Sequence, residues 1–332
     1  MKKLLSVITE SPILLVAMIC IVVPWLTKNP YLTHIILMCV IYAILASSLN
    51  IAVGFTGLSN LAHVTFFGVG AFVAAILNTR FHVPFYVTLV AGGLIAGIFG
   101  VILGAPTLRL KGVFLAMVTI AFGNAMRLLE INWVSLTNGP MVIGGISQAA
   151  IGGLTFNRIS YIYYALALLI LTMHITRQIM KSKLGRAFFA IKYDETVARS
   201  MVVNVTLYKV EAYALSACVA GMAGTIYAHY VAFISPSTFT MADSTTVLCM
   251  VVLGGAGSLV GPIAGAAILT IMPAVLRFAE LYRIVFIGIV MVVGVIARER
   301  NWPNIISDVL KRRMLRFSKR KAVENAEAGG QT

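Results

Sequence analysis

Long apolar runs, separated by short polar or glycine-rich segments, follow one another along most of the chain. Each run is apolar on every side rather than alternating, which is typical of helices surrounded by lipid. A helix needs roughly 20 apolar residues to cross the hydrocarbon core of a bilayer. The predicted membrane-spanning segments are residues 13–26, 32–53, 61–77, 85–103, 113–129, 160–175, 210–230, 245–253, 263–276 and 284–296.

Two of these segments are short or broken. Residues 245–253 are too few to cross a bilayer alone, and Pro273 interrupts the segment 263–276. Irregular backbone at membrane depth is tolerated only where protein or a water-filled cavity covers it, so whether residues 245–253 cross the membrane or re-enter it stays open. The sequence predicts an all-α polytopic membrane protein with about ten transmembrane segments.

Composition and charge agree with this prediction. Of the 332 residues, 60% are hydrophobic and only 11% are charged, against about 25% charged in soluble domains. If the chain starts inside and crosses an even number of times, most of its 26 Lys and Arg fall on the cytoplasmic side, as the positive-inside rule requires. We expect both termini in the cytoplasm, and we attribute the net charge of +15 to membrane orientation rather than to nucleic acid.

The motifs of common catalytic and cofactor-binding sites are missing from the sequence. It contains no GxxxxGK[ST] phosphate-binding loop, no HExxH and no CxxC, and its 4 cysteines all lie in apolar runs. We therefore expect no catalytic residue, no metal site and no cofactor in this chain, which argues against an enzyme.

The longest predicted cytoplasmic loop, residues 176–209, has a regular pattern of its own. The pattern predicts two short amphipathic helices, one over residues 186–192 and one that starts at Asp194. A carboxylate at Asp194 suits a helix N-terminus, and Glu195 and Arg199 have the i,i+4 order that favours an ion pair. Because the other connections are tight, this loop indicates a docking element for a soluble partner. The alternative is a solvated connector between two spans.

Two glycine-rich turns at predicted cytoplasmic junctions look alike. They are residues 54–60 (GFTGLSN) and residues 254–262 (GGAGSLVGP). Such turns let a half-helix start inside the membrane with open N–H groups, which favours anionic groups nearby. Tight helix packing is the alternative explanation.

Four stretches of sequence carry a more specific signal. They are GFTGLSNLAHVTFFGVGAFVAAIL (54–77), LKGVFLAMVTIAFG (110–123), GRAFFAIKYDETVARSMVVNVTLYKVEAYALSACVAGMAGTIYAHYVAFISP (185–236) and VVLGGAGSLVGPIAGAAIL (251–269). In this order they resemble the LivM-type permeases of ABC importers for branched-chain amino acids. The resemblance covers about residues 32–300. It implies a transmembrane permease domain over residues 1–300 in the inner membrane.

The same resemblance implies partners and coupling residues. The partners are a second, LivH-like permease, two ATPase subunits that bind the ATP, and a periplasmic substrate-binding protein. Residues 185–201 would be seated in a cleft of an ATPase subunit. The coupling residues carried over from the family are Gly185, Arg186, Ala187, Asp194, Glu195 and Ala198.

The stretch before His63 departs from the family pattern. The usual GQLSLGH reads GLSNLAH here, so Leu58, Asn60 and Ala62 replace Gln, Ser and Gly. If these side chains line the pathway, substrate preference differs too. The polar groups predicted for the translocation pathway are Asn60, His63, Thr119 and Asn124. Each of these side chains can instead form an interhelical hydrogen bond, which contributes about 0.6 kcal/mol to stability.

Two alternative functions remain at this point. A urea or short-amide ABC permease shares most of the motifs, and the carried amino acid or amide is not readable because the binding protein largely selects it. A stand-alone secondary transporter is a different class. No Asp, Glu or Lys lies in the middle of a predicted span, which argues against proton coupling but leaves sodium bound by backbone carbonyls open.

Residues 301–332 are predicted to form a basic cytoplasmic tail. Apolar residues recur at helical spacing between residues 305 and 317, with Lys and Arg around them. Such a segment lies on the lipid of an anionic leaflet, although a plain basic anchor explains the charges too. Beyond residue 323 the sequence is small and polar, so we expect disorder there.

Overall fold

The computed structural model describes residues 29–107, 110, 112–148, 150–151, 154–155, 158–201 and 204–275, and the single residues 288 and 292. The predicted spans 13–26 and 284–296, apart from those two positions, and the predicted tail 301–332 lie outside the described residues. Internal contacts divide the chain into residues 1–278 and 279–332, and every element below belongs to the first unit.

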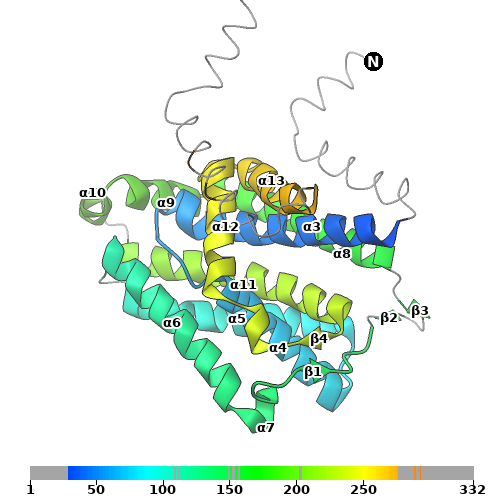
Figure 1. Ribbon diagram of the computed structural model, residues 1–332. Coiled ribbons are helices and arrows are strands. Elements are labelled where there is room, and N and C mark those ends of the chain that lie inside the picture. The colour runs from blue at the N-terminus through cyan, green and yellow to red at the C-terminus, as the bar shows by residue number, and fades with distance from the viewer. Residues whose placement is uncertain are drawn as a thin grey trace, which may run out of the picture. The chain divides into compact units, whose positions relative to one another are not determined.

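Most of the described chain is helical, with four very short strands (Figure 1). The helices are α3 (Pro30–Asn50), the π-helix η1 (Ile51–Phe55), α4 (His63–Phe81), α5 (Phe85–Thr107), α6 (Val113–Asn132), α7 (Val134–Thr137), α8 (Arg158–Lys181), α9 (Lys183–Tyr193), α10 (Glu195–Ser200), α11 (Val205–Val231), the 3₁₀-helix η2 (Pro236–Thr238), α12 (Met241–Gly254) and α13 (Gly261–Val275). The strands are β1 (Ile143–Gly144), β2 (Ala150–Ile151), β3 (Leu154–Thr155) and β4 (Phe233–Ile234). They form two antiparallel pairs, β1 with β4 and β2 with β3.

Seven of the described helical segments are long and apolar enough to cross a membrane. They are Pro30–Phe55, His63–Phe81, Phe85–Ala105, Val113–Asn132, Arg158–Lys181, Val205–Val231 and Pro236–Gly254. The first six match the predicted spans from 32–53 to 210–230 to within a few residues. The structure therefore confirms a helical protein with many membrane-capable segments.

The segment predicted over residues 245–253 is shorter than the helical segment in the structure, which starts earlier in the chain. The Thr240 side chain accepts a hydrogen bond from the Asp243 backbone N–H, and the Asp243 carboxylate accepts one from the backbone N–H of Thr240. This reciprocal cap satisfies backbone N–H groups at the start of α12. Thr240 and Asp243 therefore belong to the start of this helix, although both are polar. Asp243 thus lies inside the candidate span Pro236–Gly254, although it precedes the predicted segment 245–253.

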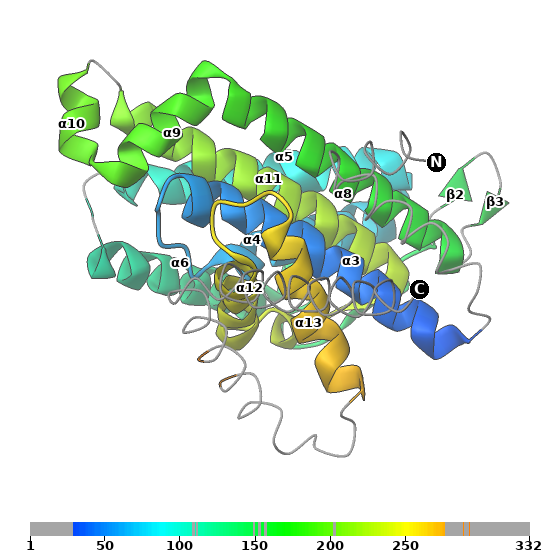
Figure 2. The ribbon, with the colours of Figure 1, turned by 90° about the horizontal axis from the view of Figure 1, so that it is seen from above.

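Helix α11 lies at the centre, between α3 and α5 in both views (Figures 1 and 2). Small residues let the helix backbones approach closely, as is common for helices in lipid. A Cβ on Gly70 of α4 would overlap the backbone of Gly221 on α11, and a Cβ on Gly221 would overlap Ala96 of α5. This three-helix contact holds the core together without large side chains.

Different elements lie at the two ends of the long helices. Helices α9 and α10 lie at one end, and the four strands lie at the other (Figures 1 and 2). At the strand end, Asn78 Oδ1 accepts a hydrogen bond from the Ser147 N–H at 2.7 Å, and His229 Nδ1 lies 2.9 Å from the Ser147 carbonyl oxygen. Helix α12 runs across α3 rather than along it in Figure 1. Even so, the chain from β4 through α12 leads from the strand end toward α9.

Candidate functional site

Side-chain caps build the helix pair α9 and α10. Ser182 Oγ accepts a hydrogen bond from the Leu184 N–H at 3.1 Å and starts α9. Asp194 Oδ1 accepts hydrogen bonds from the N–H groups of Thr196 and Val197 at 2.7 and 3.2 Å and starts α10. Both helices expected in residues 176–209 are present, and Asp194 occupies the expected N-terminal position.

The pair is attached to the membrane helices by buried side chains. Phe188 of α9 is fully buried against Ile51 and Phe55 of η1. Ile191 of α9 and Ala198 of α10 are buried beside Val205, the first residue of α11. Each large apolar side chain buried in this way contributes about 1.5–3 kcal/mol, so α9 and α10 are held to η1 and α11.

An ion pair fixes α10 to the start of α11. Glu195 Oε2 lies 3.0 Å from Lys209 Nζ, and only 10% of the Glu195 side chain and 3% of the Lys209 side chain are exposed. Glu195 Oε1 also accepts a hydrogen bond from Arg199 at 2.7 Å, which confirms the expected i,i+4 pair. Glu195 therefore holds two cations, one of them buried.

The two glycine-rich turns meet next to α9. Lys192 Nζ donates a hydrogen bond to the Gly54 carbonyl oxygen at 2.6 Å. Asn50 Oδ1 accepts a hydrogen bond from the Gly257 N–H at 2.8 Å, and Asn50 Nδ2 donates one to the Ser258 carbonyl oxygen at 2.8 Å. A Cβ on Gly54 would overlap the Asn50 side chain, so this junction requires glycine there.

Three of the four predicted pathway residues lie around the start of α4. Thr119 Oγ1 accepts a hydrogen bond from the Leu61 N–H at 3.2 Å, and Asn60 Oδ1 accepts one from the Ala62 N–H at 3.0 Å. Asn60 and His63 are both fully buried. Asn124 is exposed on α6 and does not join this group.

His63 connects three helices. The Ser48 hydroxyl donates to the Leu45 carbonyl oxygen at 2.8 Å, so the 2.8 Å contact between Ser48 Oγ and His63 Nε2 assigns the imidazole proton to Nε2. His63 Nδ1 then accepts from Ser216 Oγ of α11 at 3.5 Å. This geometry fits a structural hydrogen bond between α3, α4 and α11.

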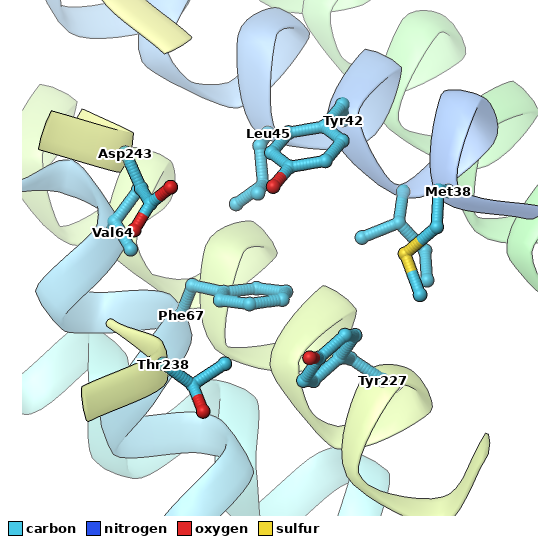
Figure 3. A pocket seen from close by; sticks show the side chains of 9 residues that line it. Met38, Tyr42, Leu45, Val64, Phe67, Tyr227, Thr238 and Asp243 are labelled. Carbon is cyan, nitrogen blue, oxygen red and sulfur yellow. The ribbon is translucent and has the colours of Figure 1, made fainter. Parts of the chain in front are cut away.

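Next to this polar group lies a cavity between α3, α4, α11 and the start of α12 (Figure 3). It holds about 350 Å³ of space not filled by atoms, counting the space at its open side. Its lining residues are Met38, Ile41, Tyr42, Leu45, Val64, Phe67, Tyr227, Thr238 and Asp243. The cavity is thus mostly apolar and aromatic, with one carboxylate.

Comparisons with known proteins agree on one family. The family model described as branched-chain amino acid transport system / permease component matches residues 31–295. The high-affinity branched-chain amino acid transport system permease protein LivM of Salmonella typhimurium is 34% identical over 318 residues, which cover 87% of this chain and 74% of that protein. This chain belongs to the branched-chain amino acid transport system permease family.

Further relatives fit the same assignment. LivM of Escherichia coli K12 is 33% identical over 87% of this chain and 74% of that protein. The autoinducer 2 import system permease protein LsrC of Escherichia coli O9:H4 is 26% identical over 60% of this chain and 58% of that protein. No solved structure matches the permease. With its membrane-capable helices, the permease is a multi-pass protein of the inner membrane.

The six predicted coupling residues divide into two groups in the permease. Gly185, Ala187 and Ala198 are buried and permit close packing of α9 and α10. A Cβ on Gly185 would meet the carbonyl oxygens of Ile179 and Met180 at the sharp turn after α8. The remaining three are polar: Asp194 caps α10, Glu195 binds Lys209 and Arg199, and Arg186 is exposed.

Sequence reasoning missed part of the exposed side of this helix pair. Phe189, Tyr193, Val197 and Met201 follow one another at intervals of four residues and are 38%, 87%, 54% and 70% exposed. We call these four residues the α9–α10 stripe. Phe189 and Tyr193 lie four residues apart on α9, and Val197 and Met201 lie four residues apart at α10, so the spacing of each pair was visible in the sequence. Asp194, in an extended conformation, separates the two pairs.

Proposed function

We propose that this permease is the LivM-like subunit of an ABC importer for branched-chain amino acids. A second, LivH-like permease completes the membrane part, two ATPase subunits bind and hydrolyse the ATP, and a periplasmic binding protein delivers the substrate. In this proposal the chemistry of ATP hydrolysis lies in the partner subunits, and this chain provides the path through the membrane. Its family membership and its close LivM relatives support this assignment.

The observation that carries the proposal is the helix pair α9–α10. It presents an exposed apolar stripe, and it is attached to η1 and α11 by buried side chains and by the Glu195–Lys209 ion pair. A stand-alone carrier has no need of an exposed apolar surface fixed to its membrane helices, whereas exposed apolar patches mark interaction sites. The stripe is the surface that an ATPase subunit would cover.

The proposed topology has ten spans with both termini in the cytoplasm. Two connections support it. Residues 233–234 pair with β1 at the strand end, while Ser258 contacts Asn50 next to Lys192 of α9. The chain from β4 to Ser258 therefore passes from the strand end of the helices to the end at α9. This passage supports counting the segment as a full crossing, as a total of ten spans requires.

Transport by the reconstituted complex tests this function. Proteoliposomes that contain the permease, its partner subunits and the binding protein should take up labelled leucine when ATP is supplied inside, and labelled urea should serve as the competing substrate. Uptake of urea without leucine would contradict the amino acid assignment.

A second arm tests the transporter class. Proteoliposomes with this chain alone should build no leucine gradient under a proton or sodium gradient, because its energy source lies in other subunits. Concentrative uptake by this chain alone would show that it is a secondary transporter. A complex whose ATPase subunits cannot hydrolyse ATP is the matched control.

A further inference from the structure

The carboxylate of Asp243 is exceptional among the residues that line the cavity. It lies within the candidate span Pro236–Gly254. A charged side chain in a membrane segment is costly, and such residues usually mark a substrate or ion path. None of the described residues that line the cavity is basic, so the cavity wall itself offers no cation to neutralise the charge.

The role of Asp243 in capping α12 uses one carboxylate oxygen. Asp243 Oδ2 accepts hydrogen bonds from the Thr240 N–H at 3.1 Å and from Thr240 Oγ1 at 2.5 Å. Figure 3 shows the carboxylate facing Tyr42 and Leu45 across the cavity, whereas the hydroxyl of Thr238 points away from it. The cap engages Oδ2, and the carboxylate lines the cavity.

The other walls are mostly apolar. Met38, Ile41, Leu45 and Phe67 provide an apolar surface. Val64, at the start of α4, also lines the cavity, and its backbone N–H donates a hydrogen bond to Ser244 Oγ of α12 at 3.2 Å. These walls therefore suit an apolar side chain, and the carboxylate is the charged group among them.

We propose that this cavity binds the amino acid on its way through the permease, with Asp243 bound to the substrate ammonium group. The apolar side chain of the substrate lies against Met38, Ile41 and Leu45. A neutral amide has no ammonium group and does not need Asp243. The apolar lining with a single carboxylate matches an amino acid that has an apolar side chain. This inference rests on the proposed function and adds a substrate site to it.

The test compares two variants in the reconstituted complex. Asp243→Asn keeps the shape and the cap but removes the charge, and it should lower leucine uptake about tenfold or more, the effect of losing one charged hydrogen bond. The stimulation of ATP hydrolysis by loaded binding protein should persist. Thr240→Ala removes the hydroxyl of the cap and keeps the carboxylate, so its uptake should fall clearly less than that of Asp243→Asn.

A second pair of variants tests the cavity without changing Asp243. Met38→Trp should fill the cavity and block leucine uptake, whereas Ile36→Trp, on the same helix but away from the cavity, should not. Normal uptake by both Asp243→Asn and Met38→Trp would overturn the proposal, as would equal losses in Asp243→Asn and Thr240→Ala. Failure of the wild-type complex to carry leucine would instead refute the proposed function.

Discussion

The Glu195–Lys209 ion pair allows a quantitative test of how α10 is held. The sequence alone suggests an exposed pair with Arg199, worth about 0.3–0.5 kcal/mol, so that a change at Glu195 leaves the fold intact. The structure alters that expectation because the Lys209 side chain is only 3% exposed and lies 3.0 Å from Glu195. Removing one partner of a buried pair costs about 3–5 kcal/mol.

We expect Glu195→Gln to lower the free energy of unfolding by about 3 kcal/mol, since Lys209 stays buried without its counter-charge. Arg199→Ala should cost less than about 1 kcal/mol, because 58% of the Arg199 side chain is exposed. Equilibrium unfolding of the purified permease in mixed micelles measures both values.

The charge swap provides the control. Glu195→Lys places two ammonium groups together, so it should be the least stable variant. A complex that contains it should hydrolyse ATP without transport. The double variant Glu195→Lys with Lys209→Glu should recover much of the lost stability, because substitutions at the two residues of one ion pair have strongly non-additive effects. Equal losses in the free energy of unfolding for Glu195→Gln and Arg199→Ala would show that the Glu195–Lys209 pair does not act as a buried ion pair, and would refute this reasoning.

Three further substitutions test the rest of the site. Lys192→Met removes the hydrogen bond to Gly54, and leucine uptake per ATP should fall about tenfold while Lys183→Met has no effect. Tyr193→Asp should weaken copurification of the ATPase subunits at least about tenfold. The free energy of unfolding of the permease should change little, since Tyr193 is 87% exposed. Unchanged copurification would exclude the α9–α10 stripe as the docking surface. Gly221→Leu should prevent folding because of its contacts with Gly92 and Ala96, whereas Met222→Leu should cost less than about 1.5 kcal/mol.

Local signals predicted the elements well. Hydropathy located six spans, and the carboxylate at Asp194 located the start of α10, because helix caps depend on residues that are adjacent in sequence. The same local chemistry was available for α12, where Thr240 and Asp243 have capping-box spacing. Hydropathy alone excluded both residues from the span, and the carboxylate in the cavity was missed for that reason.

Contacts between distant segments were not predictable. Helical spacing places Phe188 near Ala187 and Ile191 and Phe189 on the opposite side, but nothing in residues 176–209 indicates that Phe188 packs against η1. The burial of Lys209 follows from the start of α11 at Val205, which extends a predicted span into the loop. Thr119 and Leu61 are 58 residues apart and meet through helix packing. One sequence without relatives contains no signal for such pairs.

The junction beside α9 shows how motion at the ATPase side would reach the cavity. Lys192 binds the carbonyl oxygen of Gly54 in the π-helix η1, and π-helical turns are frequent at functional sites. The chain leads from η1 through residues 56–62 to Val64 on the cavity wall. On the other side, Asn50 holds Gly257 and Ser258, which follow directly on α12 and its Asp243. We therefore expect a displacement of α9 to move α4 and α12, which both line the cavity. We propose that these few hydrogen bonds couple binding in the cavity to ATP-driven movement of α9.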